Sequence, residues 1–333
     1  MTYIVAEMSA NHNLDFERAV KIIEAAKEAG ANAVKLQTYT ADTITINCEK
    51  EYFRLKGSQW KEKYLYRLYD KAYTPWEWQA RLKEIAEGFG MDLFSTPFDH
   101  KAVDFLESIN IPAYKVASFE IVDIPLLKKI AQTGKPVIIS TGMASFLEIE
   151  EAVQTLRKYG ATSVALLKCT SAYPALPEEM NLRTIPHMAD TFHVPVGLSD
   201  HTMGSAVAVA VVALGACIVE KHLTLSRKIH GPDSSFSMEP HEFRQMVRDI
   251  RTVEKALGAV SYELTEGQGK NIVFRRSLFV VRDVKAGEKF GEENVRSIRP
   301  GHGLHPRHFE DIMGKPATKD IERGTPLSWD LVA

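Results

Sequence analysis

Up to about residue 257 the chain repeats one pattern: a short apolar, β-branched run, then a polar turn, then an amphipathic stretch. This alternation is typical of parallel strands joined by crossover helices. Eight runs have the length and composition of buried strands, at residues 3–8, 33–37, 92–97, 113–118, 136–141, 164–169, 194–200 and 217–222. Eight strands in about 250 residues are what a closed (β/α)8 or TIM barrel requires. We therefore predict that α/β fold for the first part of the chain.

The first amphipathic stretch indicates how the helices pack. Its apolar residues recur at intervals of three and four, and Gly30 follows them as a helix stop. These apolar positions are Phe16, Ala19, Val20, Ile23 and Ala26. The spacing predicts a helix whose apolar face covers the barrel.

The segment 38–91 is too long for a plain connection between a barrel strand and its helix. It is rich in aromatic residues, including Trp60, Tyr64, Tyr66, Tyr69, Trp76 and Trp78. An aromatic insertion at this place favours a functional lid or a helical excursion.

The repeating pattern ends near residue 264. We predict a catalytic barrel over 1–264, a polar linker over 265–275 and a small β-rich domain over 276–333. In the last domain we expect a strand at 276–281, turns at 285–287 and 322–326, and a final short strand. About 60 residues bury only a small core, so this domain should pack on the barrel or on another subunit.

Charge and composition narrow the classes of partner. Lysine plus arginine (41) nearly balances aspartate plus glutamate (43), which gives no net field toward nucleic acid or an anionic membrane. The longest apolar run, 206–214, is far shorter than the roughly 20 residues of a membrane span and predicts a buried helix. No signal peptide is evident at the N-terminus, and three cysteines without a CxxC pair favour neither disulfides nor a zinc–thiolate site. We expect a cytoplasmic protein with neither nucleic acid nor membrane as partner.

Polar residues gather where the predicted strands end, which is where barrel enzymes carry their active sites. They include Glu7, Lys35, Gln37, Thr96, Lys115, Ser118, Glu120, Ser140, Lys168, Ser171, Ser199, Asp200, His201, Glu220, Lys221 and His222. Any single one is explained as a helix cap or a solvated strand end. So many at one edge of a barrel indicate a site.

Two lysines among hydroxyls predict an anion site. Lys35 and Lys115 alternate into positions that face the barrel lumen, and ammonium and hydroxyl donors together suit a phosphate. The alternative is that each lysine forms a structural ion pair with Glu7 or Glu120.

Two histidines predict a metal. His201 and His222 end neighbouring strands, so their imidazoles can meet above the barrel mouth, although each alone is also explained as a core or capping residue. Two imidazoles without a thiolate favour an open site, completed by water and substrate oxygens, for Mn²⁺ or Mg²⁺. Glu7 and Glu120 are the candidate acid and base, and the sequence does not rank them.

Six motifs, in the right order, resemble the sialic acid synthase family. They are AEMSANHN at 6–13, KLQT at 35–38, YKVASFE at 114–120, STGM at 140–143, GLSDH at 197–201 and EKH at 220–222. RPGHG at 299–303 and the segment 321–327 resemble the antifreeze-protein-like (SAF) module. The resemblance covers nearly the whole chain.

The resemblance implies a carbon–carbon bond-forming transferase that condenses phosphoenolpyruvate with an open-chain acetamido sugar, releasing phosphate. It implies that His201 and His222 hold a divalent metal, Mn²⁺ first and Mg²⁺ or Co²⁺ as alternatives. Glu7, Glu120 and His222 are the expected catalytic residues. The expected phosphoenolpyruvate ligands are Lys35, Thr96, Lys115, Ser118, Ser140, Ser171 and Ser199. The expected sugar contacts are Gln37, Tyr173, Asp233 and Arg299, the last reaching the partner's site in a domain-swapped homodimer.

Further segments resemble the pseudaminic acid branch of the family, which uses a 2,4-diacetamido-2,4,6-trideoxy-hexose. They lie at 56–60, 66–69, 74–78, 167–173 and 234–237. The aromatic insertion and Phe236 would offer apolar surface to the methyl group of such a sugar. Sialic acid synthases usually carry asparagine where Ser171 stands, so the role carried over to Ser171 departs from the family pattern.

Three alternatives remain open. The first is an N-acetylneuraminate or legionaminate synthase of the same family. The second is a metal-dependent sugar isomerase or lyase. The third is a sugar-binding protein whose barrel no longer catalyses a reaction. The isomerase or lyase leaves the two lysines and the C-terminal module without a role. The sugar-binding protein would not need every catalytic residue type to be present.

Overall fold

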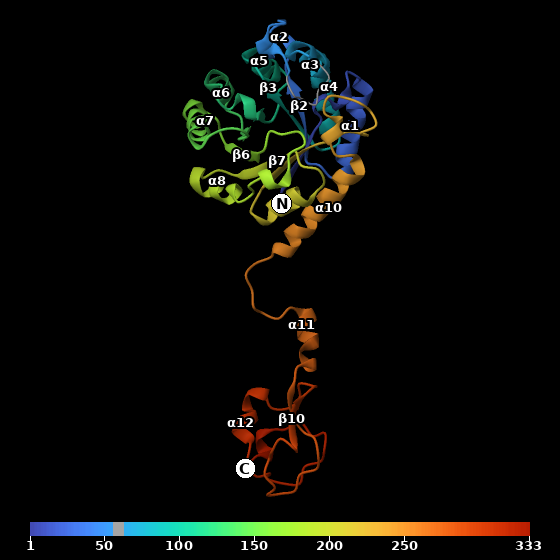
Figure 1. Cartoon of the computed structure of the whole chain (residues 1–333), viewed down its shortest axis with the longest axis vertical. Coiled ribbons are helices and arrows are strands. Elements are labelled where there is room, and N and C mark those ends of the chain that lie inside the picture. Colours follow the sequence, from blue (N-terminus) through green and yellow to red (C-terminus); the bar gives the residue numbers. More distant parts are fainter. Residues whose placement is uncertain (56–62) are drawn as a thin grey trace. The chain divides into compact units, whose positions relative to one another are not determined.

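A computed structural model describes residues 1–55 and 63–333 and divides the chain into two compact units, 1–258 and 259–333 (Figure 1). The predicted linker, 265–275, holds helix α11 (Glu266–Asn271) and the 3-10 turn η6 (Ile272–Phe274). Each unit has a hydrophobic core of its own.

Eight parallel strands close the first unit into a barrel in sequence order, with β8 pairing back onto β1. They are β1 (Tyr3–Glu7), β2 (Ala33–Thr38), β3 (Asp92–Pro97), β4 (Tyr114–Val116), β5 (Val137–Ser140), β6 (Val164–Cys169), β7 (Val196–Asp200) and β8 (Ile218–His222). The predicted barrel is confirmed. Strand β4 is shorter than predicted because the 3-10 turn η3 (Ser118–Glu120) takes up its end.

One helix of the outer ring follows each strand in the sequence. Figure 1 shows several of these helices, among them α5, α6, α7 and α8, on the outside of the barrel. These helices are α1 (Phe16–Ala29), α4 (Trp76–Gly88), α5 (His100–Ser108), α6 (Ile124–Ala131), α7 (Phe146–Tyr159), α8 (Thr184–Phe192), α9 (Ala206–Ala213) and α10 (Pro240–Leu257). Helix α1 buries Ala19, Ile23 and Ala26 and ends at Gly30, whose φ of 91° is left-handed, as the spacing predicts. The prediction of a buried helix at 206–214 was too strong, because in α9 only Ala208, Val211 and Val212 are buried.

Before α4 the long second connection adds α2 (Ala41–Ile44), η2 (Glu51–Phe53) and α3 (Leu65–Ala72), so it is a helical excursion as predicted. Its aromatic rings pack on one another and on the barrel helices. Tyr39 lies 5.7 Å from Tyr69, and Trp76 lies 4.9 Å from Phe105, between ring centroids. Trp60 and the motif at 56–60 lie outside the described residues.

The barrel lumen has an apolar floor with a polar layer above it. Val5, Ala33, Phe94, Ile138, Leu167 and Ile218, from six different strands, form one buried cluster. Because side chains alternate along a strand, the residue two positions later faces the lumen one step closer to the strand ends. Those residues are Glu7, Lys35, Thr96, Ser140, Cys169 and Glu220. The register thus carries charged and hydroxyl groups into a common layer.

The second unit contains an antiparallel pair, β9 (Ser277–Val280) and β10 (Val295–Ile298), and the short helix α12 (Phe309–Ile312). The remaining 3-10 turns of the chain are η1 (Ser9–His12), η4 (Pro177–Glu179), η5 (Ser234–Phe236), η7 (Pro306–His308) and η8 (Trp329–Leu331). The predicted turns at 285–287 and 322–326 are present, with Gly287 and Gly324 left-handed. The final strand predicted after Pro326 is wrong, because only isolated bridges form there, at Pro326 and Val332.

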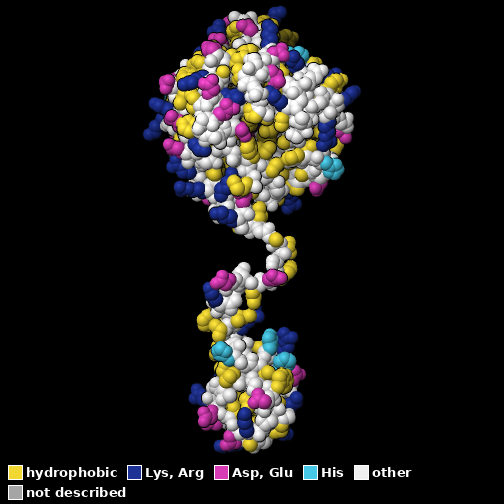
Figure 2. All heavy atoms as spheres, turned by 180° about the vertical axis from the view of Figure 1, so that it is seen from behind, with side chains coloured by type: hydrophobic (Ala, Val, Ile, Leu, Met, Phe, Trp, Pro, Cys, Tyr) yellow, Lys and Arg dark blue, Asp and Glu magenta, His cyan; other side chains and the backbone are white. Residues whose placement is uncertain are grey.

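Within the described residues no helix combines the length and the hydropathy needed to cross a bilayer. Charged side chains of both signs are scattered over the barrel unit, and hydrophobic side chains gather on one of its faces (Figure 2).

We expect Gly197→Ala to destabilise the barrel. Gly197 lies on β7, and a Cβ there would stand 2.2 Å from the Ile218 carbonyl oxygen and 2.8 Å from Leu167 Cδ2. The neighbouring strand must move, so the free energy of unfolding should fall by about 1–3 kcal/mol in urea denaturation. The matched control is Gly88→Ala, exposed at the end of α4 with nothing within 4 Å. Equal unfolding midpoints for the two variants would show that the close approach at Gly197 is unimportant.

Candidate active site

Two lysines and two glutamates form a buried, charge-balanced centre in the polar layer of the lumen. Lys35 Nζ lies 2.7 Å from Glu7 Oε2 and 3.5 Å from Glu220 Oε1, and Lys115 Nζ lies 4.0 Å from Glu220 Oε1. None of the four side chains is more than 6% exposed. The alternative of an ion pair with Glu7 therefore holds for Lys35, while Lys115 pairs with Glu220 rather than with Glu120.

The four groups differ in how readily they ionise. Burial raises the pKa of Glu7, and Glu220 adds to the rise while Lys35 opposes it. Burial also disfavours the charged form of Glu220, but Lys115 and Lys35 outweigh it and lower the pKa. For Lys35 the two carboxylates outweigh burial and raise the pKa, whereas burial lowers the pKa of Lys115. Glu7 is therefore the carboxyl of this centre that most readily holds a proton.

Hydroxyl groups surround the two ammonium groups. Lys115 Nζ donates to Ser140 Oγ at 2.6 Å, and Lys35 Nζ lies 3.5 Å from Thr96 Oγ1. Ser199 Oγ donates at 3.3 Å to Glu220 Oε1, the oxygen that both lysines approach. Cations and hydroxyl donors that converge in this way can bind a phosphate or carboxylate.

Ser118 and Ser171 complete this ring from two further loops. Gly142 N donates to Ser118 Oγ at 3.1 Å. A Cβ at position 142 would lie 2.2 Å from Ser171 Oγ and 2.8 Å from Ser118 Oγ. Glycine at position 142 therefore lets the two hydroxyls converge.

The two predicted histidines lie together, with ring centroids 5.4 Å apart. His201 Nδ1 lies 3.0 Å from the Thr170 carbonyl oxygen, to which only a protonated Nδ1 can donate, so in the neutral ring Nε2 keeps its lone pair. His222 Nδ1 is buried without a hydrogen-bond partner, and burial holds the pKa of His222 well below its ordinary value. A neutral imidazole with an unused nitrogen is a competent metal ligand.

The donor set fits a divalent metal held by two imidazoles, with the other positions supplied from outside the protein. Over residues 1–55 and 63–333, no group of three or more His, Cys, Asp or Glu is placed to hold a metal.

An aromatic wall stands beside the imidazoles. The Tyr173 ring lies 4.3 Å from His201 and 5.1 Å from Phe236, and Phe236 lies 5.1 Å from His222. This wall gives apolar surface next to the polar groups, which is the usual composition of a small-molecule site.

Gln37 and Asp233 face the same site from β2 and from the loop after β8. Gln37 Nε2 donates to Glu7 Oε1 and to Ser9 Oγ, each at 3.1 Å, and Ser9 Oγ in turn donates to Asp233 Oδ2. Gln37 and Asp233, two of the four predicted sugar contacts, are thus connected through Ser9. The sequence analysis gave Ser9 no role.

Glu120 is a second carboxyl suited to proton transfer. It ends η3, and its Oε2 is buried without a hydrogen-bond partner. Burial raises the pKa of Glu120 to about 7, so it can both accept and donate a proton near neutral pH.

Arg299 is the one predicted site residue outside the barrel unit. It is exposed in the second unit. All the other predicted residues lie in the barrel unit, at or beyond the carboxyl ends of its strands.

Sequence reasoning noted Glu220 at a strand end but gave it no role. Its signal was strand parity, because Glu220 is two residues before His222 and must face the lumen with it. Cys169 was also missed. Its Sγ lies 3.8 Å from both His201 Nδ1 and Ser171 Oγ. The neighbouring Lys221 has the opposite parity and pairs with Asp200 at 2.6 Å, which makes it structural.

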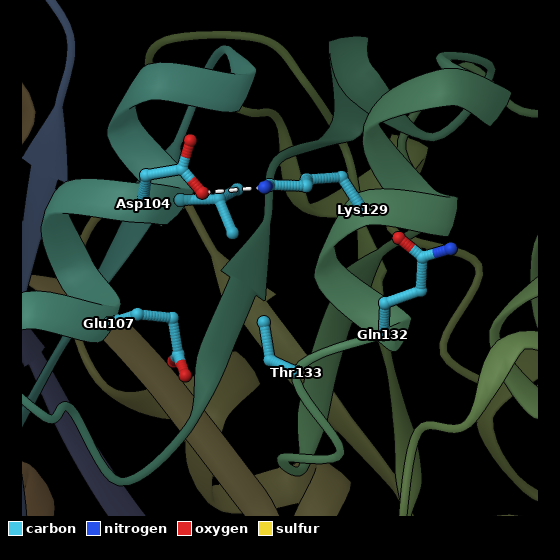
Figure 3. A pocket seen from close by; sticks show the side chains of 6 residues that line it. Asp104, Glu107, Lys129, Gln132 and Thr133 are labelled. Carbon is cyan, nitrogen blue, oxygen red and sulfur yellow. Dashed lines mark ion pairs between the residues drawn. The ribbon is translucent and has the colours of Figure 1, made fainter.

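A separate hollow lies in the helix layer (Figure 3). Asp104 and Glu107 reach it from α5, Lys129 from α6, and Gln132 from the position directly after α6. Asp104 Oδ1 lies 2.5 Å from Lys129 Nζ, and Glu107 accepts a hydrogen bond from the Tyr114 hydroxyl at 2.8 Å. These contacts join neighbouring elements, so we do not place the active site there.

Comparisons with known proteins show the family of this chain. The NeuB family matches residues 22–262, and the SAF domain matches residues 275–333. A pseudaminic acid synthase of Campylobacter jejuni subsp. jejuni (strain 81-176) is 46% identical over 98% of this chain and 95% of its own. An N,N'-diacetyllegionaminic acid synthase of Campylobacter jejuni (strain ATCC 700819) is 39% identical over 96% and 97%. The crystal structure of an N-acetylneuraminic acid synthetase from Leptospira borgpetersenii, in complex with citrate, has a TM-score of 0.72 and 32% identity, and the match covers 81% of this chain and 90% of that one.

We expect Glu120→Gln to change how stability depends on pH. The folded pKa of about 7 exceeds the ordinary 4.5, so the folded state binds more protons between these values. The contribution of Glu120 to stability is therefore full below pH 4.5 and is lost as the pH rises through 7. Relative to wild type, Glu120→Gln should gain up to about 3 kcal/mol of unfolding free energy between pH 4.5 and 8.

The measurement is urea denaturation at several pH values. Glu178→Gln, at an exposed carboxylate on η4, is the matched control and should show no such trend. A constant difference between Glu120→Gln and wild type at every pH would contradict the burial argument.

Proposed function

Since the chain belongs to the NeuB family, we propose that it condenses phosphoenolpyruvate with the open-chain form of a 2,4-diacetamido-2,4,6-trideoxy-hexose. The products are pseudaminic acid and phosphate. The observation that carries the proposal is the pair of buried lysines, Lys35 and Lys115, ringed by hydroxyls beside two imidazoles.

Phosphoenolpyruvate suits the centre because it brings a carboxylate and a phosphate to two ammonium groups. We assign its binding to Lys35 and Lys115 with the hydroxyls of Thr96, Ser118, Ser140, Ser171 and Ser199. The converging geometry around Gly142 supports the roles of Ser118 and Ser171. A serine at 171 keeps a hydrogen-bond donor at a position where the family usually has asparagine.

His201 and His222 would hold the divalent metal, Mn²⁺ first, with Mg²⁺ or Co²⁺ as alternatives. When bound, such an ion supplies a Lewis acid for the oxygen of the sugar aldehyde. Tyr173, Gln37 and Asp233 would orient the sugar from the side. The aromatic wall that includes Phe236 supports a substrate with a methyl group at its sixth carbon.

In the proposed reaction, the enol carbon of phosphoenolpyruvate bonds to the aldehyde carbon of the sugar. Water adds to the resulting oxocarbenium-like carbon, and the carbon–oxygen bond to phosphate then breaks. The aldehyde oxygen gains one proton, and the attacking water loses one. As the carbon–oxygen bond to phosphate breaks, the second proton of the former water passes to the phosphate and its oxygen becomes the keto oxygen. We assign the first transfer to Glu7, which touches Gln37, and the second to Glu120, which shares a turn with Ser118. The raised pKa values of both carboxyls support these roles.

The nearest alternative product is legionaminate or N-acetylneuraminate. This alternative rests on the 39% identity to a legionaminic acid synthase. The identity to the pseudaminic acid synthase is higher, at 46%, and favours the pseudaminic product. The NeuB match supports neither a sugar isomerase or lyase nor a retired sugar-binding barrel.

The proposed assembly is a domain-swapped homodimer in the cytoplasm, in which Arg299 of each chain completes the site of the other. Exposed apolar residues on the segments after β4 to β7, including the first turn of α7, support a covered barrel mouth: Phe119, Val122, Met143, Leu147, Leu176 and Met203. Further exposed apolar residues follow α10 and support a second contact: Val260, Tyr262, Leu264, Ile272 and Phe274. The three free cysteines suit a reducing compartment.

We expect purified protein to release phosphate only when phosphoenolpyruvate and the sugar are both present, and to need a divalent metal. The product should have the mass of pseudaminic acid. His201→Ala should lower turnover at least about 100-fold, whereas His187→Ala, exposed on α8, should not. Preference for N-acetylmannosamine over the diacetamido sugar would place the enzyme in another branch.

We expect two inactive chains to complement each other if Arg299 acts in the partner's site. The Arg299→Ala chain and the His201→Ala chain should each be inactive alone. When the two are co-expressed, half of the dimers should contain one chain of each kind. Each such dimer has one intact site of two, so about a quarter of wild-type activity should return. Arg296→Ala, exposed on β10, is the control and should be active alone. Mixed dimers without activity would exclude the shared site.

A further inference from the structure

The segment that follows β1 has an unusual backbone. Ser9, Asn13 and Leu14 have φ values of 45°, 47° and 54°, in the left-handed region, although none of them is glycine. A side chain with a Cβ rarely adopts this conformation, and such residues gather where function requires them. The turn η1 (Ser9–His12) is nevertheless almost completely buried, so its conformation is fixed by its surroundings.

Hydrogen bonds fasten this segment to the loop after β8. Asn11 Nδ2 donates to the Leu223 carbonyl at 3.0 Å and to Ser237 Oγ at 2.9 Å. Asn13 Nδ2 donates to the His230 carbonyl at 2.9 Å. The loop that carries Asp233 is therefore held by the segment after β1.

Ser9 occupies the middle of this contact. Its hydroxyl donates to Asp233 Oδ2, and Ala10 N approaches the same oxygen at 3.3 Å. The hydroxyl has one hydrogen, so toward Gln37 it acts as acceptor, at 3.1 Å from Nε2. The other hydrogen of the Gln37 amide goes to Glu7 Oε1, also at 3.1 Å.

These bonds fix the orientation of two polar groups. With both amide hydrogens engaged, Gln37 has its carbonyl oxygen left to accept a hydrogen bond from a ligand. With one oxygen bound to Ser9 and Ala10, the Asp233 carboxylate has Oδ1 left for the same purpose. A glycine at position 9 would adopt the left-handed backbone with less strain than serine does. What serine provides at this position, and glycine would not, is the hydroxyl group.

We propose that Ser9 is a positioning residue for the acetamido sugar, which holds Asp233 and Gln37 in the orientation that binds sugar hydroxyl and amide groups. The proposal rests on the proposed function and deepens it, because it adds a determinant of sugar affinity outside the phosphoenolpyruvate subsite. Ser9 itself touches neither the lysines nor the imidazoles in any contact found among the described residues.

Two variants of Ser9 separate the hydroxyl from the backbone. Ser9→Ala removes the hydroxyl and keeps the backbone strain, whereas Ser9→Gly removes the hydroxyl and relieves the strain. Both should raise the KM for the sugar about tenfold and change the KM for phosphoenolpyruvate by less than about twofold. Ser9→Gly should melt at a higher temperature than Ser9→Ala.

Leu14→Gly is the matched control, because it relieves a left-handed residue of the same segment that is 43% exposed. It should leave both KM values unchanged. An equal rise in the sugar KM for Leu14→Gly and Ser9→Gly would overturn the role of the hydroxyl, because the segment as a whole would then be responsible.

A double-mutant cycle tests whether Ser9 acts through Asp233. Ser9→Gly should have clearly less than its tenfold effect on sugar affinity when Asp233→Ala is already present, because only the contact of Ser9 with Gln37 is then left to lose. Affinity is read from the rise in melting temperature with added sugar, which needs no turnover. A full tenfold effect in that background would overturn the proposal. Wild-type protein that releases no phosphate with any sugar would instead refute the proposed function.

Discussion

Two ammonium groups buried between two carboxylates are the constraint on which the rest of this site depends. Removing one partner from such a buried pair leaves an uncompensated charge, at a cost of about 3–5 kcal/mol. The barrel can therefore bury any one of these four side chains only when the other three and their hydroxyl partners are present. The four are Lys35, Lys115, Glu7 and Glu220. The same four charges prepare the lumen for an anionic ligand, which can replace a carboxylate as the partner of a lysine.

Strand parity explains both what the sequence predicted and much of what it missed. Alternation placed Lys35 and Lys115 in the lumen, and the structure brings both of them to Glu220. The same rule places Glu220 there, but a glutamate between a valine and a lysine has no sequence signal of its own. Lys221 and Asp200, equally prominent as strand-end residues, point away from the lumen and bind each other.

Contacts between distant segments were beyond sequence reasoning. The bond from Ser9 to Asp233 joins residues 224 positions apart, and nothing in the pattern at either end announces it. Local patterns predicted the turns of the C-terminal unit correctly, because glycines such as Gly287 specify them. They failed for its last strand, because whether an apolar run forms a ladder depends on which neighbour is available to pair with it.

The apolar floor of the lumen closes the barrel on one side of the polar layer. Val5, Phe94 and Leu167, with the rest of that cluster, close the channel one residue pair below the lysines. Lys35 and His222 both stand opposite Glu7 in the register of the neighbouring strands, so both side chains start from one level of the barrel. Because this cluster closes the lumen below the lysines, any ligand of their ammonium groups must enter and leave past the carboxyl ends of the strands.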